Sequence, residues 1–180
     1  ERTMRRVLLR LPFLAVTLGG ELALAFIAKR FEYTLQEVVS LAFFIPVVNA
    51  MGGNVGLQSS TVVVRGIALG EIRVQSLARM LWREMAVGAV IGLICAAAVF
   101  GVAFLLSGES DVLRVSAAVG VAMFCGVSLA ALSGTLIPLA CWRLKFDPAI
   151  AAGPFITTLN DVTCLTIYLA IATLLLKGLT

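Results

Sequence analysis

The chain has 180 residues, of which 61% are hydrophobic and 13% charged, and its mean hydropathy is +1.05. Soluble domains are about 45–50% apolar and roughly 25% charged, so a soluble fold of this size is excluded. The sequence contains no histidine, which excludes a histidine-based catalytic triad or zinc site. The net charge of +4 does not indicate nucleic-acid binding, because the basic residues separate apolar segments and form no basic face.

Five apolar segments are long enough to cross a membrane as helices. They are residues 11–28, 38–64, 85–106, 115–141 and 149–176. The alternation typical of barrel strands is missing, so the sequence predicts an all-α integral membrane protein with a single transmembrane domain over residues 1–180. Residues 69–84 fit either an amphipathic extension of the third span or a charged loop. The chain begins with Glu1 and not with Met, so we expect it to be part of a longer polypeptide.

The basic residues predict the orientation of these spans. Ten of them lie at one end of the predicted bundle: Arg2, Arg5, Arg6, Arg10, Arg65, Arg73, Arg79, Arg83, Arg143 and Lys145. The opposite end has four basic residues, diluted by acidic ones: Lys29, Arg30, Arg114 and Lys177, with Glu32, Glu37, Glu109 and Asp111. Because cytosolic loops carry the excess of positive charge, we expect a cytosolic N-terminus and a C-terminus outside.

Two acidic side chains fall within the predicted spans, Glu21 and Asp161. A charged residue at the centre of a membrane helix costs roughly 2.5–3.5 kcal/mol on insertion scales, and such residues mark ion or substrate pathways. The spacing of Thr157 and Asp161 places both on one helical face. Glu21 has two open interpretations, a carboxyl that packs between helices or the coupling site of a carrier.

The second span is polar in a different way. Gly52, Gly56 and Ser60 form a ridge of small residues, and Gly53 and Asn54 lie beside it. Amide, hydroxyl, carboxylate and carbonyl oxygens are hard ligands that suit Mg²⁺ or Ca²⁺. The spans contain no basic side chain that would bind an anion, so these residues predict a cation pathway.

Two stretches resemble the MgtE-type magnesium transporters. Residues 46–71 (PVVNAMGGNVGLQSSTVVVRGIALGE) are similar to the second membrane helix of that family, and residues 147–163 (DPAIAAGPFITTLNDVT) to the fifth. The resemblance implies a homodimer with five helices per subunit and a pore on the two-fold axis. It also implies that Asp161 is the pore aspartate, so that two copies hold a largely hydrated Mg²⁺ ion. Gly53, Asn54 and Thr157 would be secondary lining residues.

The resemblance further implies passive, channel-like Mg²⁺ transport in the cell membrane of a bacterium or archaeon, with Mg²⁺ as both cargo and ligand. In the family an aspartate matching Asp147 lies near cytosolic Mg²⁺ sites, although Asp before Pro is also a common helix cap. The family's cytosolic N-terminal and CBS regulatory domains are not in this chain.

Three alternatives remain open at this point. The first is a divalent cation carrier coupled to Na⁺ or H⁺ through Glu21. The second is a helical scaffold that transports nothing. The third, an intramembrane di-aspartyl enzyme, would need two aspartates within the spans, and only Asp161 qualifies. We therefore expect a transporter and not an enzyme. The oxygen ligands would accept Mn²⁺, Co²⁺ or Ca²⁺ as well as Mg²⁺.

Overall fold

The computed structural model describes residues 2–71, 77–106, 111–151 and 153–176. Arg73, Glu109 and Lys177, which entered the prediction of orientation, lie outside these residues. The regular secondary structure of the described part is entirely helical, as the sequence predicts. Its helices are α1 (Arg2–Arg30), α2 (Glu32–Glu37), α3 (Ser40–Ala68), α4 (Leu77–Leu106), α5 (Val112–Arg143), α6 (Pro148–Ala151) and α7 (Pro154–Leu176).

Four of these helices, α3, α4, α5 and α7, are each long and apolar enough to cross a membrane. The fifth candidate is α1, which is bent by 49° between Thr3–Leu9 and Leu14–Arg30. Pro12 lies at this bend and explains it, because proline removes one backbone hydrogen bond of a helix and its ring clashes with the preceding turn. The described residues thus form four spans, or five if the bent α1 counts as one.

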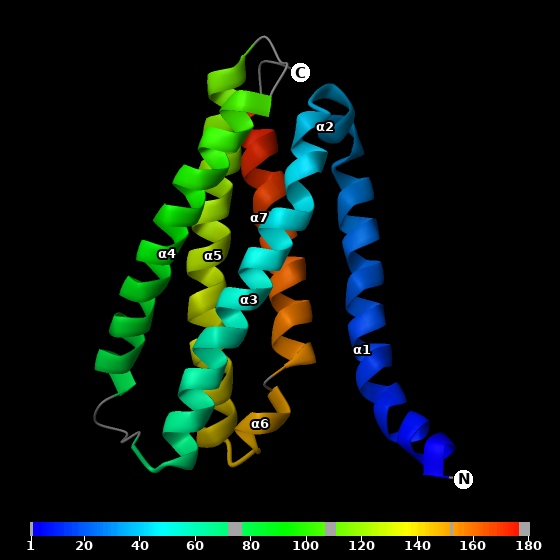
Figure 1. Cartoon of the computed structure of the whole chain (residues 1–180), viewed down its shortest axis with the longest axis vertical. Helices are drawn as coiled ribbons and strands as arrows, with labels where there is room; N and C mark the ends of the chain where they lie inside the picture. The colour runs from blue at the N-terminus through cyan, green and yellow to red at the C-terminus, as the bar shows by residue number, and fades with distance from the viewer. Residues whose placement is uncertain (1, 72–76, 107–110, 152, 177–180) are drawn as a thin grey trace.

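The long helices run alternately up and down, so that the start of α1 and the end of α7 lie at opposite ends of the bundle (Figure 1). α5 is the central helix: α3, α4 and α7 all pack against it, and most of its length is buried. α1 lies at the edge and packs mainly on α7. Large apolar side chains cover the outside, among them Leu105 with 82% and Phe26 with 78% of its surface exposed. Such a surface fits lipid and not water.

The core lies between α3, α5 and α7. Tyr168 of α7 is completely buried there, and its hydroxyl donates a 2.8 Å hydrogen bond to the backbone carbonyl of Leu41 in α3. A second link lies near the same end of the bundle, where the hydroxyls of Thr34 in α2 and Thr173 in α7 are 3.0 Å apart. These bonds fix the end of α7 that is farther from Asp161.

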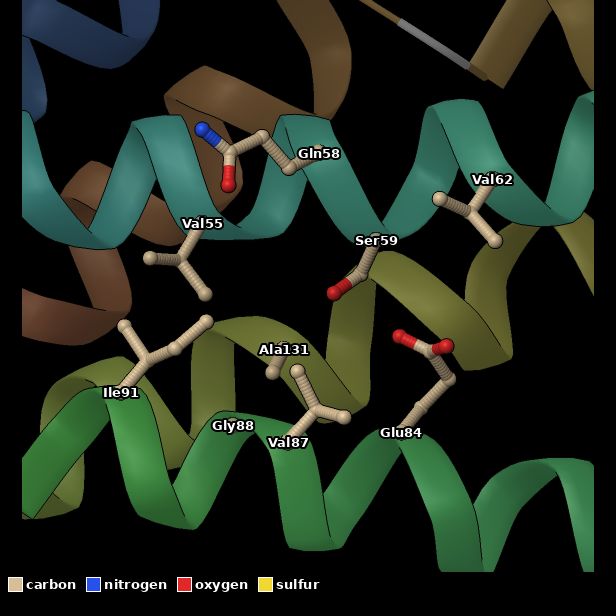
Figure 2. A pocket seen from close by; sticks show the side chains of 9 residues that line it. All are labelled: Val55, Gln58, Ser59, Val62, Glu84, Val87, Gly88, Ile91 and Ala131. Carbon is tan, nitrogen blue, oxygen red and sulfur yellow. The ribbon is translucent and has the colours of Figure 1, made fainter.

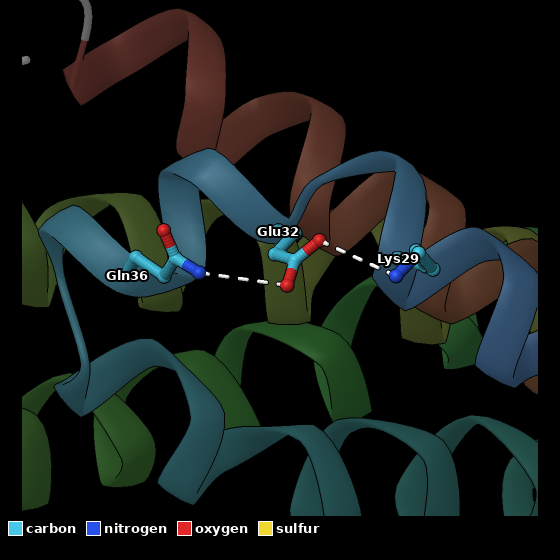
Figure 3. A network of polar contacts seen from close by, with 3 residues as sticks. All are labelled: Lys29, Glu32 and Gln36. Carbon is cyan, nitrogen blue, oxygen red and sulfur yellow. Dashed lines mark hydrogen bonds and ion pairs between the residues drawn. The ribbon is translucent and has the colours of Figure 1, made fainter.

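The turn between α1 and α2 is polar. The Glu32 carboxylate lies 3.8 Å from the Lys29 ammonium and accepts a 3.5 Å hydrogen bond from the Gln36 side chain (Figure 3). These side chains are exposed, so the contacts add little stability. Their charge is nevertheless suited to the polar boundary of a membrane, where a helix end must leave the lipid.

Two helix boundaries differ from those that hydropathy predicts. The expected span 149–176 is interrupted: the short helix α6 precedes a turn at Gly153, whose φ of +90° favours glycine, and α7 begins at Pro154. In the 69–84 segment, α3 ends at Ala68 and α4 already begins at Leu77. The helical interpretation therefore holds for residues 77–84, while residues 72–76 lie outside the described part.

Candidate cation pathway

Asp161 lies in the first half of α7, where its half-buried carboxylate faces α3. The Asp161 Oδ1 atom is 3.2 Å from the point where a side chain at Gly53 would place its Cβ. The lack of a side chain at residue 53 therefore lets the carboxylate lie close to the α3 backbone, and an added Cβ would push it away by a few tenths of an ångström. The structure thus brings together two of the residues that the sequence singled out, from helices more than 100 positions apart in the chain.

The close approach of α3 to its neighbours depends on three glycines. A Cβ at Gly52 would collide with the Cys164 side chain of α7, and one at Gly56 with the Asn160 side chain. On the other side, a Cβ at Gly134 of α5 would collide with the backbone carbonyl oxygen of Gly56. α3 and α5 therefore cross in direct backbone contact, which is what a ridge of small residues permits between membrane helices.

A buried polar pair holds α7 in this position. The Ser133 hydroxyl of α5 donates a 2.6 Å hydrogen bond to Asn160 Oδ1, and Asn160 is 1% exposed. The Asn160 Nδ2 group has no hydrogen-bond partner among the described residues. Because Asn160 precedes Asp161, the Asn160–Ser133 pair fixes the rotation of α7 that turns Asp161 toward Gly53.

Asn54 and Thr157, the other predicted lining residues, lie next to Gly53 and Asp161 but differ in exposure. Asn54 is exposed beside Gly53. Thr157 is half-buried one turn before Asp161, and its hydroxyl donates a 3.1 Å hydrogen bond to the Pro154 carbonyl. It thus shares the face of Asp161, as the spacing predicts.

Asp147 is separate from this group. It is exposed ahead of α6, and its Oδ1 accepts a 2.9 Å hydrogen bond from the Ala149 amide. This geometry is that of a helix cap, and it supports the structural interpretation of the Asp-Pro pair. α7 itself begins seven residues before Asp161, which is about 10 Å along a helix.

The sequence did not predict where Glu21 lies relative to Asp161. It lies on α1 with its side chain exposed, and it is near enough to Asp161 for the two carboxyl groups to interact electrostatically. The preceding residue, Gly20, is in contact with the Thr158 side chain of α7, so the two helices touch at this level. Two neighbouring carboxylates repel each other unless a proton or a cation lies between them. Glu21 therefore belongs to the surroundings of Asp161 and does not pack elsewhere.

The chain supplies few acidic ligands at this site. Within residues 2–71, 77–106, 111–151 and 153–176, no three Cys, Asp or Glu side chains come close enough to hold a metal ion together. Glu21 and Asp161 make a pair, and the other oxygens nearby belong to uncharged groups. A pair of carboxylates facing an open side of the molecule is suited to a hydrated ion, which needs outer ligands and not a closed cage.

Comparison with known proteins identifies a family of relatives. The profile of the MgtE family, described as a divalent cation transporter, matches residues 45–171. The magnesium transporter MgtE of Bacillus subtilis is 39% identical over 94% of this chain and 37% of its own length. The magnesium transporters MgtE of Enterococcus faecalis and Thermus thermophilus are 33% and 35% identical over 98% and 95% of the chain.

The chain spans 37–38% of the length of these curated relatives. The family profile covers residues 46–71 and 147–163, the two stretches that carry the resemblance, and it includes Gly53, Asn54 and Asp161. With its apolar helices, the chain is a multi-pass membrane protein, and it belongs to the MgtE family.

Proposed function

We propose that the chain forms the membrane part of a transporter that conducts Mg²⁺ passively across the cell membrane. The observation that carries this proposal is the Asp161 carboxylate, which lies within a membrane-spanning helix and against the bare backbone of Gly53. Placing an anionic group at this depth of the membrane costs free energy, and a bound cation would reduce that cost. The three relatives named as magnesium transporters support Mg²⁺ as that cation.

The number of ligands favours two copies of the chain around one ion. Mg²⁺ requires six oxygens in near-ideal octahedral geometry and keeps several of its waters. Two Asp161 carboxylates facing each other across a two-fold axis would balance the charge of the dication through those waters. Gly53, Asn54 and Thr157 would line the same path, and Asp147 would lie nearer its entrance.

A membrane potential supplies the driving force in this proposal. Each 100 mV is worth about 2.3 kcal/mol per elementary charge, so an inside-negative potential favours the entry of a dication by about twice that amount. The excess of basic residues at one end of the bundle supports the orientation with the N-terminus in the cytosol.

Ion flux into liposomes tests the role of Asp161. We expect the Asp161→Asn variant to lose at least nine-tenths of the potential-driven Mg²⁺ uptake, because the amide keeps the shape and removes the charge. Asp111→Asn is the matched control, since it removes the same charge from a half-buried residue ahead of α5 that pairs with Arg114. Uptake by the Asp161→Asn variant at the level of this control would refute the proposal.

The contact between Glu21 and Asp161 favours one second candidate, a divalent cation carrier coupled to H⁺ or Na⁺. In that case Glu21 would exchange the coupling ion with the site at Asp161. The Glu21→Gln variant separates the two mechanisms. A passive pore would keep uptake that follows the potential, whereas a carrier would lose the countermovement of protons or Na⁺ together with the uptake. Proton and Na⁺ fluxes measured in the same liposomes distinguish these results.

A further inference from the structure

A cleft with a volume of about 170 Å³ lies between α3 and α4, away from Asp161 (Figure 2). It exists because both helices pack on α5 and barely touch each other. α4 lies close to α5 at Gly88, where a Cβ would come within 2.5 Å of the Ala131 Cβ. Ala131 of α5 therefore forms the floor of the cleft, and the facing sides of α3 and α4 form its walls.

The two ends of this cleft differ in chemistry. At one end the Glu84 carboxylate of α4 and the Ser59 hydroxyl of α3 point into the gap from opposite walls, whereas the Gln58 side chain lies along α3 on the side of Val55 (Figure 2). At the other end Val55 and Ile91 face each other. The cleft thus combines one negative charge with neutral acceptors and an apolar wall.

Glu84 has no cationic partner in the described part of the chain. Its side chain is half-buried, and neither of the two ion pairs found there involves it. The groups that face it across the cleft from α3 and α5 are uncharged: Ser59, Val62 and Ala131. A carboxylate that is partly removed from water and unpaired is unfavourable, so a cationic group in the cleft would be stabilised.

We propose that this cleft binds the ammonium headgroup of an aminophospholipid. One carboxylate balances a single positive charge, and a primary ammonium offers three N–H donors, which the two carboxylate oxygens of Glu84 and the hydroxyl oxygen of Ser59 could accept. The methylene groups next to the ammonium would lie on the valine side chains of the walls. A hydrated divalent ion fits less well, because its water shell would face apolar side chains and half of its charge would stay unbalanced.

The surroundings of the cleft favour a lipid over a soluble amine. Val62 and Val87 at its rim are exposed, and α4 presents further apolar side chains, such as Val90, to the membrane. Exposed Arg79 and Arg83 near the start of α4 add positive charge at the same end of the helix as Glu84, which would favour the phosphate that follows the ammonium in such a lipid. A carboxylate in the cleft and cationic side chains at the same end of α4 complement a zwitterionic headgroup.

Lipid binding to the purified full chain tests this proposal. In detergent, we expect phosphatidylethanolamine to be retained in native mass spectra and to raise the melting temperature, whereas phosphatidylcholine, which has no N–H donor, does neither. Glu84→Gln should weaken phosphatidylethanolamine binding at least tenfold. Glu71→Gln is the matched control, since it neutralises an exposed carboxylate outside the cleft and near the same end. Val55→Phe should also weaken binding by filling the apolar end, and it serves if Glu84→Gln does not fold.

Three results would overturn the proposal. The first is equal binding of the two lipids by the unmodified protein. The second is unchanged phosphatidylethanolamine binding by both the Glu84→Gln and the Val55→Phe variants. The third is binding of butylamine or of Mn²⁺ at Glu84 that is as tight as binding of the lipid, detected by displacement and by electron paramagnetic resonance respectively. The last result would assign the cleft to a soluble amine or to a metal ion.

Discussion

Replacing Gly134 by alanine should weaken the whole helix bundle, because it pushes α5 away from α3. A Cβ at Gly134 would overlap the carbonyl oxygen of Gly56 and lie 2.9 Å from its carbonyl carbon and 3.0 Å from its Cα. All three atoms are backbone, so no side-chain rotation can relieve the overlap. The helices must separate, and the contact between α3 and α7 at Gly53 and Asp161 changes with them.

The size of the effect follows from two opposing contributions. An alanine in a helix is favoured over glycine by about 0.5–1 kcal/mol, which would stabilise the variant. Overpacking of a tight contact costs about 1–3 kcal/mol, and contact with backbone places Gly134→Ala at the upper end of that range. The net loss in unfolding free energy is then about 2 kcal/mol, which lowers the melting temperature by roughly 4–8 °C for a chain of this length.

Gly101→Ala provides the control for this prediction. Gly101 lies in α4 with no atom within 4 Å of the Cβ position, so its replacement should be neutral or slightly stabilising. Both variants would be followed by thermal unfolding in detergent and by Mg²⁺ uptake in liposomes. If Gly134→Ala melts at the same temperature as Gly101→Ala, the backbone contact between α3 and α5 does not limit the stability of the bundle.

Three further changes have defined outcomes. Ser133→Ala should lower the free energy of unfolding in detergent by about 1–3 kcal/mol, because the buried Asn160 side chain loses its hydrogen-bond partner. It should also reduce Mg²⁺ uptake, and unchanged uptake would contradict a positioning role. Tyr168→Phe should cost about 1 kcal/mol by the same measurement and leave uptake intact, since its 2.8 Å hydrogen bond lies far from the site. Pro12→Ala should straighten α1, which would lengthen the distance between spin labels at positions 4 and 26 by about 3 Å. An unchanged distance would show that Pro12 does not cause the 49° bend.

Much of the fold and part of the site could be predicted from the sequence. Hydropathy identifies the long apolar helices because the membrane demands continuous apolar length. The helical period places Thr157 and Asp161 on one face, and the ridge of small residues indicates that α3 packs closely. Asp161 stood out as a carboxylate within an apolar span and Gly53 as a lining residue that the resemblance implies, and the structure places them side by side.

The remaining features depend on how the helices pack together, which a local sequence pattern does not predict. The proximity of Glu21 and Asp161 requires α1 to pack on α7, and its sequence signal was only a carboxyl in an apolar segment. The hydrogen bond of Ser133 to Asn160 requires α5 and α7 to pack together, so no pattern near Ser133 in the sequence predicts it. The break at Gly153 is hidden from hydropathy because the residues around it are apolar, although the Gly-Pro pair is itself a turn signal.

The peripheral position of α1 has a mechanical consequence. α3, α4, α5 and α7 form one packed body, whereas α1 leans on that body mainly along α7 (Figure 1). A tilt of α1 would therefore require little repacking of the core and yet would move Glu21 relative to Asp161. Force applied at the edge of the bundle would thus change the electric field at the proposed ion site.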